Sequence, residues 1–149
     1  MKQTIIIPCI PPTSTSQQKG ACIVGGKHIR FFKKAKVAQA ENSLVSLLST
    51  AKREQMSGAS FQSGPLAVNI TLVFPYLKRD KKADIAAGAH VWIDTRPDLD
   101  NLCKMLLDAM TTCAYWHDDS QVADLRLTKR RGPITGITIT IENVQNISL

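Results

Sequence analysis

The sequence contains no long apolar run and no pair of closely spaced cysteines. Its apolar runs stay far below the ~18 residues that a membrane-spanning helix requires, and the first of them, Ile5–Ile7, is too short for a secretory signal. A zinc or redox site is not expected, because no Cys-x-x-Cys pair occurs among the four cysteines, Cys9, Cys22, Cys103 and Cys113. We therefore expect a cytoplasmic protein whose cysteines are small buried hydrophobic residues.

Acidic residues are also few. The 149 residues include 12 Asp and Glu against 19 Lys and Arg, which gives a net charge of +7 and a pI near 9.4. The cations gather in three basic clusters, Lys33–Lys36, Lys78–Lys82 and Lys129–Arg131. Clustered cations indicate a polyanionic partner, most often nucleic acid, although a merely solvated basic surface is the alternative.

Length and composition are those of one globular domain spanning residues 1–149, with 44% hydrophobic and 21% charged residues. Alternating apolar residues predict strands at 4–7, 66–74, 123–127 and 137–141, and a Gly25-Gly26 turn predicts a small hairpin. Helical spacing predicts a helix from Lys33 to about Gln55 and a second after Pro97, while residues 76–94 read as a long loop or distorted hairpin. We expect an α/β (α+β) fold: a small mixed sheet packed with two helices.

Two aspartates stand close together just after Pro97, in the stretch RPDLDNLCK. At a helix N-terminus one of Asp98 and Asp100 could cap the helix, worth about 1 kcal/mol. A helix has a single N-cap residue, so capping would explain only one of the two carboxylates. Lys104 follows Asp100 by four residues and therefore lies on the same helix face.

A second acidic point is WHDDSQV, residues 116–122, just ahead of a predicted strand. Neighbours on a strand point to opposite faces, and counting back from Leu125 favours Asp119 over Asp118. Two or three carboxylates suffice to hold Mg²⁺, which can activate water and neutralise charge on a phosphate. The spacing therefore suggests a metal-dependent nuclease, with a helix cap and a turn as the open alternative.

The segments TRPDLDNLCKMLLDAM (95–110) and YWHDDSQV (115–122) together resemble the signature of the RusA-type Holliday-junction resolvases, small endodeoxyribonucleases common in bacteria and prophages. The family pattern runs R-x-D-x-D-N-L-x-K, then a helix with D-A, then W-x-D-D-x-Q-V, and every position is met here. One departure is Cys113-Ala114 before the aromatic pair, where relatives often have glycine.

The resemblance implies a homodimer that nicks two opposed strands of a four-way DNA junction symmetrically, with Mg²⁺ or in its place Mn²⁺. It assigns the metal ligands to Asp98, Asp100 and Asp119, and a further catalytic role to Lys104. Asn101 and Asp118 are then expected to support those ligands by hydrogen bonding. Another metal-dependent nuclease, acting on flaps or single strands, and a non-catalytic DNA-binding module remain as alternatives.

Contacts with DNA are expected from cations around the acidic site, namely Lys78, Arg79, Lys81, Lys82, Arg96, Lys129 and Arg130. Lys19, Lys27 and Arg30 are further candidates in a region where such proteins vary. For Phe31 and Phe32 a place in the core is favoured over a wedge in DNA, although a wedge at a junction centre would suit the implied function.

Overall fold

The computed structural model describes residues 1–15, 19–26 and 28–145, and its centre is a five-stranded mixed sheet. In sheet order the strands are β1 (Lys2–Ile7), β7 (Gly136–Asn143), β4 (Leu66–Phe74), β6 (Val122–Arg131) and the short β5 (Val91–Trp92). Neighbouring strands are antiparallel except β4 and β6, which are parallel. A parallel pair needs a crossover connection, and the crossover decides where the two acidic segments lie.

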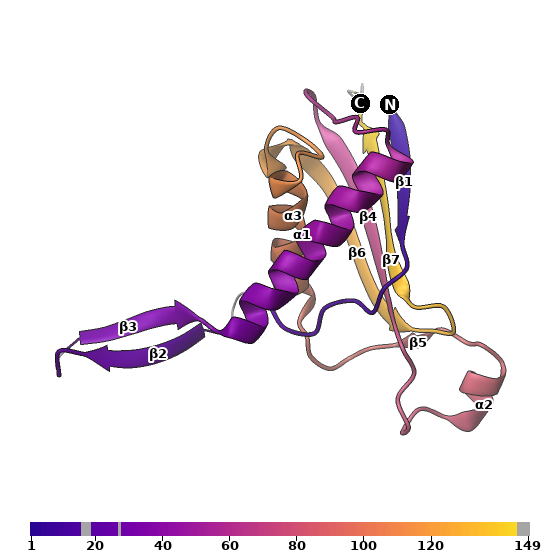
Figure 1. Cartoon of the computed structure of the whole chain (residues 1–149). Coiled ribbons are helices and arrows are strands. Elements are labelled where there is room, and N and C mark those ends of the chain that lie inside the picture. Colours follow the sequence, from indigo (N-terminus) through magenta and orange to yellow (C-terminus); the bar gives the residue numbers. More distant parts are fainter. Residues whose placement is uncertain (16–18, 27, 146–149) are drawn as a thin grey trace, which may run out of the picture.

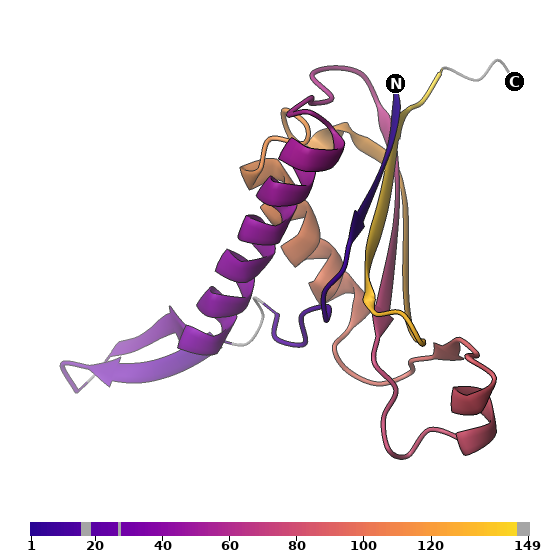
Figure 2. The same ribbon diagram turned by 45° about the vertical axis from the view of Figure 1, so that its right-hand side comes forward.

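The crossover from β4 to β6 contains α2 (Lys82–Ala86), β5 and α3 (Leu99–Thr112). The longer α1 (Ala35–Gln55) and α3 pack on the same face of the sheet, as Figure 2 shows with the sheet nearly edge-on. Asp98 and Asp100 lie where α3 begins, whereas Asp118 and Asp119 lie between its end and the start of β6. None of the helices in the described residues is both long and apolar enough to cross a membrane.

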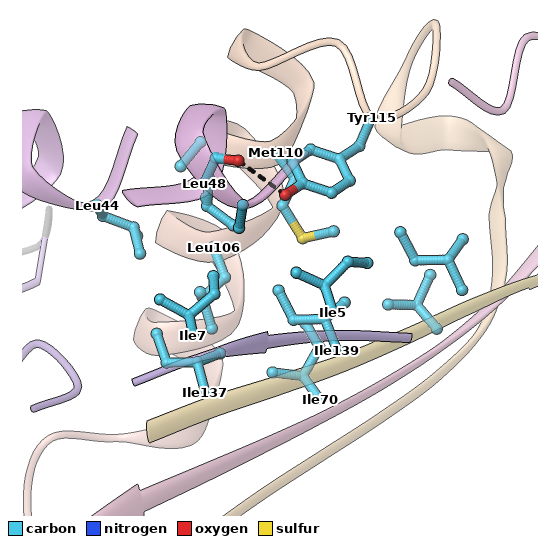
Figure 3. Close-up of a cluster of buried hydrophobic side chains, with 14 of the residues drawn as sticks. Ile5, Ile7, Leu44, Leu48, Ile70, Leu106, Met110, Tyr115, Ile137 and Ile139 are labelled. Atoms are coloured by element: carbon cyan, nitrogen blue, oxygen red, sulfur yellow. Dashed lines mark hydrogen bonds between the residues drawn. The ribbon is translucent and has the colours of Figure 1, made fainter. Parts of the chain in front are cut away.

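The core forms between the sheet and these two helices because β4 alternates strictly: its buried side chains are Leu66, Val68, Ile70, Leu72 and Phe74. Ile5, Ile139 and Ile70 face one another across three strands in register. Figure 3 shows this row beneath the helices, with the Tyr115 hydroxyl donating a hydrogen bond of 2.9 Å to the Leu48 carbonyl of α1. The apolar face of the sheet therefore determines which sides of α1 and α3 are buried.

The expected elements are largely confirmed, with differences at their ends. The second helix begins at Leu99, as expected from Pro97, and the first begins at Ala35, two residues later than expected. The pairing of β6 with β4 shifts at its start, so that Ala123 has no partner there. Counting back along the strand through this irregularity was therefore wrong as an argument for Asp119.

The hairpin predicted at Gly25-Gly26 is confirmed as β2 (Lys19–Val24) and β3 (His28–Lys33), which form a sheet of their own. Both glycines have positive φ angles of 63° and 72°, which glycine adopts readily where the chain reverses between Val24 and His28. The hairpin extends away from the body of the molecule (Figure 1). The expectation of a core position for Phe31, Phe32 and Cys22 is wrong, because all three are exposed on this hairpin.

Candidate active site

Asp98 and Asp100 lie together at the N-terminus of α3, and both are exposed. Asp98 occupies the N-cap position with extended backbone angles, yet its side chain accepts no hydrogen bond from the first turn. The capping explanation therefore does not account for its carboxylate. Asp100 lies in the first turn, where the helix dipole favours negative charge. The structure thus presents two carboxylates to solvent without a structural task for the first.

The segment that leads into Asp98 is held by a lysine from the neighbouring sheet. The ammonium group of Lys129 donates hydrogen bonds of 2.6 Å to the Thr95 carbonyl and 2.7 Å to the Pro97 carbonyl. Only 9% of Lys129 is exposed. These bonds flank Arg96 and place the start of α3 at the end of β6, so the position of Asp98 depends on Lys129.

A second buried cation anchors the loop that follows β4. The Arg131 guanidinium lies 3.4 Å from the Asp80 carboxylate, and the two side chains are 10% and 7% exposed. The other oxygen of Asp80 accepts a hydrogen bond of 2.6 Å from the Leu77 backbone. This ion pair fixes the loop between β4 and α2, which carries the exposed cations Lys78, Arg79 and Lys81; Lys82, also exposed, begins α2.

The cations expected to contact DNA therefore divide into two groups. Arg96, the three cations of the β4–α2 loop and Lys82 of α2 are exposed, as phosphate contacts require. Lys129 is instead buried and bonded to two carbonyls. Arg130 is partly buried, and its Nε atom lies in the interior without a hydrogen-bond partner. The alternation of Leu125 and Leu127 could have placed residues 129 and 131 on the helix-covered face, since Lys129 pairs with Leu72.

Lys104 lies one turn beyond Asp100 on α3 and is exposed. Its ammonium group is 3.5 Å from the carboxylate of Asp108, one turn further along the helix. An exposed pair of this kind contributes only a few tenths of a kcal/mol. The side chain is therefore held loosely enough to turn toward a ligand bound at the carboxylates.

The segment WHDDSQV forms a tight turn that separates the roles of its two aspartates. Asp118 caps the 3₁₀ helix η1 (Asp119–Gln121), accepting a hydrogen bond of 2.9 Å from the Ser120 backbone. The Gln121 side chain accepts hydrogen bonds of 2.9 and 3.2 Å from the backbones of His117 and Asp118. Hydrogen bonding from the side chain and backbone of Ser120 lowers the pKa of Asp118. Both carboxylates are exposed, and the structural task falls to Asp118.

Asp119 lies at the far end of α3 from Asp98 and Asp100. Fourteen helical residues separate the two ends, which corresponds to about 20 Å at 1.5 Å per residue. The structure therefore brings Asp98 and Asp100 together but does not bring Asp119 to them within one chain. Across residues 1–15, 19–26 and 28–145, no three His, Cys, Asp or Glu side chains gather closely enough to hold a metal ion.

Asn101 and Cys103 lie in the first turns of α3 and are partly buried. Burial, and secondarily the charge of Asp100, raises the pKa of the Cys103 thiol. Cys103 is consequently a neutral residue next to the carboxylates. All four cysteines are free, but only Cys9, Cys103 and Cys113 are even partly buried.

Comparison with known proteins finds one family over nearly the whole chain. Residues 10–142 match the family model described as Endodeoxyribonuclease RusA. The chain is 33% identical over 131 residues to the crossover junction endodeoxyribonuclease of Lactococcus phage r1t, covering 88% of this chain and 90% of that protein. It is 50% identical over 51 residues to the crossover junction endodeoxyribonucleases of Escherichia coli strain K12 and Enterobacteria phage 82, covering 34% of this chain and 41% of each of those proteins. The chain belongs to the RusA family of endodeoxyribonucleases.

Proposed function

We propose that this protein is a structure-specific endodeoxyribonuclease that resolves four-way DNA junctions by nicking two opposed strands in a reaction dependent on Mg²⁺. The observation that carries the proposal is the pair of exposed carboxylates at the start of α3, on a segment that Lys129 holds in place. Membership of the RusA family and the printed names of the similar phage and bacterial proteins support the same reaction.

The carboxylates suit a hard divalent cation. Mg²⁺ binds through one or two carboxylates together with waters and substrate phosphate oxygens, and Asp98 and Asp100 provide two such groups, both exposed. The bound ion would neutralise charge on the scissile phosphate and favour deprotonation of an attacking water. Mn²⁺, with the same preference for oxygen ligands, is expected to substitute.

The remaining steps fall to side chains of the chain itself. Lys104 can turn from Asp108 to stabilise negative charge on the phosphate. The exposed cations of the β4–α2 loop and Arg96 are placed to bind neighbouring phosphates. Asn101 is positioned in the same turn as Asp100 to support a carboxylate by hydrogen bonding.

A homodimer resolves the separation of Asp119 from the other two aspartates. If a two-fold axis sets two copies of α3 antiparallel, the Asp98 end of each helix meets the Asp119 end of the other. Two large apolar side chains, Leu99 of α3 and Leu125 of the adjacent β6, are more than a third exposed and available for such a contact. The dimer would hold two equivalent three-carboxylate sites, one for each of two opposed strands of the junction.

The test of the proposed function is cleavage of a labelled branch-mobile four-way junction, a linear duplex and a flap of equal length, each with Mg²⁺ and with a chelator. Asp98→Asn and Asp100→Asn are compared with the control Asp124→Asn, an exposed aspartate of β6 away from the start of α3. We expect paired nicks on the junction alone, lost in the first two variants while junction binding is retained.

Other outcomes separate the alternatives. Normal cutting by the Asp98 and Asp100 variants would show that the site is elsewhere. Cutting of the flap or duplex in place of the junction would retain the metal chemistry and reject the substrate. Tight junction binding without cutting by any of the proteins would leave a DNA-binding module.

The shared site has its own test, which mixes two inactive chains. In a heterodimer of Asp98→Asn with Asp119→Asn, a site built from both chains is intact at one of its two positions, whereas sites built within single chains are all defective. We expect the mixture to nick one strand per junction although each variant alone is inactive. An inactive mixture, with chain exchange verified, would reject the antiparallel arrangement.

A further inference from the structure

The hairpin of β2 and β3, here called the arm (residues 19–26 and 28–33), carries side chains that the proposed function has not used. In both views it extends from the start of α1, away from the sheet (Figures 1 and 2). Every described residue of β3 is exposed, and on β2 only Gly20 is partly buried. An isolated two-stranded hairpin is marginally stable in water, so its exposed apolar side chains require a partner surface.

The two faces of the arm differ in chemistry. Directly opposed residues of an antiparallel pair share a face. The pairs Ala21–Phe31 and Ile23–Ile29 therefore form an apolar face over the outer part of the arm, with the cationic pair Lys19–Lys33 on the same side at its base. Ile23, Ile29 and Phe31 on this face are 67–74% exposed. The face holds its three largest side chains out to solvent over the outer half of the arm.

The opposite face carries the cation Arg30 opposite Cys22, and His28 opposite Val24. Nearer the body on that face, the tip of the Phe32 ring lies over Gly20, where a Cβ atom would come within 2.4 Å of it. Phe32 thus stabilises the arm itself by covering backbone, a task that Phe31 does not share. The two adjacent phenylalanines have separate roles, and only Phe31 is free for a ligand.

The charge of the chain is concentrated around this arm. No Asp or Glu occurs before Glu41, and the seven Lys and Arg of residues 1–40 equal the whole net charge of +7. Six of these seven cations lie between Lys19 and Lys36. A cationic segment of this kind is complementary to a polyanion, which favours DNA over a second copy of the same cationic arm as the occupant.

The arm also emerges beside the proposed catalytic lysine. At its base, Lys33 forms an ion pair with Glu41, and both line a groove between α1 and α3 together with Asp108, the residue that pairs with Lys104. The base of the arm and the partner of Lys104 therefore line the same groove. Apolar side chains presented by basic elements are the means by which several DNA-bending proteins separate base steps.

We propose that the arm binds the branch point of the junction, with its cations on the converging phosphate backbones and Ile23, Ile29 and Phe31 against unstacked bases. This inference rests on the proposed function, since it names the part of the protein that distinguishes branched from linear DNA. It assigns the apolar face to branch recognition and the cationic groups to general affinity for DNA.

The test compares Ile29→Ser/Phe31→Ser with Ile134→Ser, which removes an apolar side chain that is 81% exposed at the β6–β7 turn. Arg30→Gln reports on the cationic face. Binding is measured in a chelator, so that no cleavage is needed, to a four-way junction and a linear duplex, with 2-aminopurine at the branch point reporting base unstacking. Sedimentation of each protein gives its oligomeric state.

We expect Ile29→Ser/Phe31→Ser to weaken junction binding by about tenfold or more, abolish the 2-aminopurine signal, and leave duplex binding within about twofold. Arg30→Gln weakens binding to both DNAs, and Ile134→Ser behaves as wild type. Unchanged junction binding and fluorescence in the double variant would overturn the proposal. So would loss of the dimer, which would make a second copy the occupant of the arm. Wild-type protein that binds junction and duplex equally would instead contradict the proposed function.

Discussion

Replacing Lys129 by methionine tests the arrangement that holds the active-site segment. The substitution keeps a long flexible side chain but removes the ammonium group that bonds the Thr95 and Pro97 carbonyls. A hydrogen bond from a charged donor contributes ~1.5–3 kcal/mol, and part of that is recovered because these carbonyls lie near the surface and can bind water. We expect the free energy of unfolding to fall by about 2–4 kcal/mol, which lowers the melting temperature by roughly 5–15 °C for a chain of this size.

We expect the rate of cleavage to fall by more than the loss of stability would explain. Loosening the segment ahead of Asp98 displaces a carboxylate, and a misplacement near 1 Å costs on the order of 100-fold in rate. Gln55→Leu is the matched control, since Gln55 also makes two side-chain bonds to backbone, to the N–H and carbonyl of Ile6 at 2.8 and 2.7 Å. That variant is expected to lose stability while cleaving within about twofold of wild type when assayed below its melting temperature.

Two measurements distinguish a structural lysine from one that contacts phosphate: the junction affinity at several salt concentrations and the thermal unfolding of each variant. A lysine that contacts phosphate would lower the salt slope by about one on removal and leave the melting temperature unchanged. Exposed Lys81→Met is expected to behave in that way. If Lys129→Met reduced the salt slope without reducing stability, Lys129 would be a DNA contact after all and the structural reasoning would be refuted.

Three further predictions concern the carboxylates away from the start of α3. Asp119→Asn is expected to abolish junction cleavage, whereas Asp118→Asn, which keeps an oxygen to cap η1, should retain most of it; equal losses in a gel-based cleavage assay would contradict the division of roles. Hydrogen bonds hold the pKa of Asp118 below its ordinary value near 3.8, so its charge stabilises the fold above that pH and ceases to do so as pH falls through the lowered value. We therefore expect the difference in unfolding free energy between wild type and Asp118→Asn to be constant from pH 7 to about 5 and to disappear in stronger acid. Urea unfolding at several pH values measures this difference. Asp80→Ala leaves Arg131 buried without its partner and is expected to lower the free energy of unfolding by about 3–5 kcal/mol. Asp80→Leu/Arg131→Leu should recover a large part of that loss. A coupling energy below about 1 kcal/mol in a double-mutant cycle, as for an exposed ion pair, would show that the loop is not anchored there.

Short-range patterns in the sequence predicted most of the secondary structure. Alternation over residues 66–74 corresponds to β4, and helical spacing together with Pro97 located α3, because these signals depend only on side-chain periodicity and local backbone chemistry. Ala123 marks where such counting fails. The pairing of β6 with β4 skips this residue, and a register shift is decided by the partner strand.

The sequence predicted which residue types the candidate site contains, but not how they are arranged in space. The order and spacing of Asp98, Asp100, Lys104 and Asp119 carried the resemblance to the family, since a signature is a property of the chain. Whether the carboxylates meet depends on α3, which is about 20 Å long and has Asp98 at its start and Asp119 beyond its end. For this reason we propose that a second copy of the protein completes the site.

The sequence by itself indicated a polyanionic partner, through its charge, and carried the signature of the family, through the spacing of its acidic residues. Only the tertiary structure decided which charged groups are free to act. Lys129 and Arg131 look like surface cations in the sequence, yet the register of β6 against β4 turns them toward the helix-covered face, where they bind Pro97 and Asp80. Phe31 looks like a core residue, yet the arm leaves it exposed. Burial depends on which elements pack together, and that information lies in contacts between residues distant in the chain.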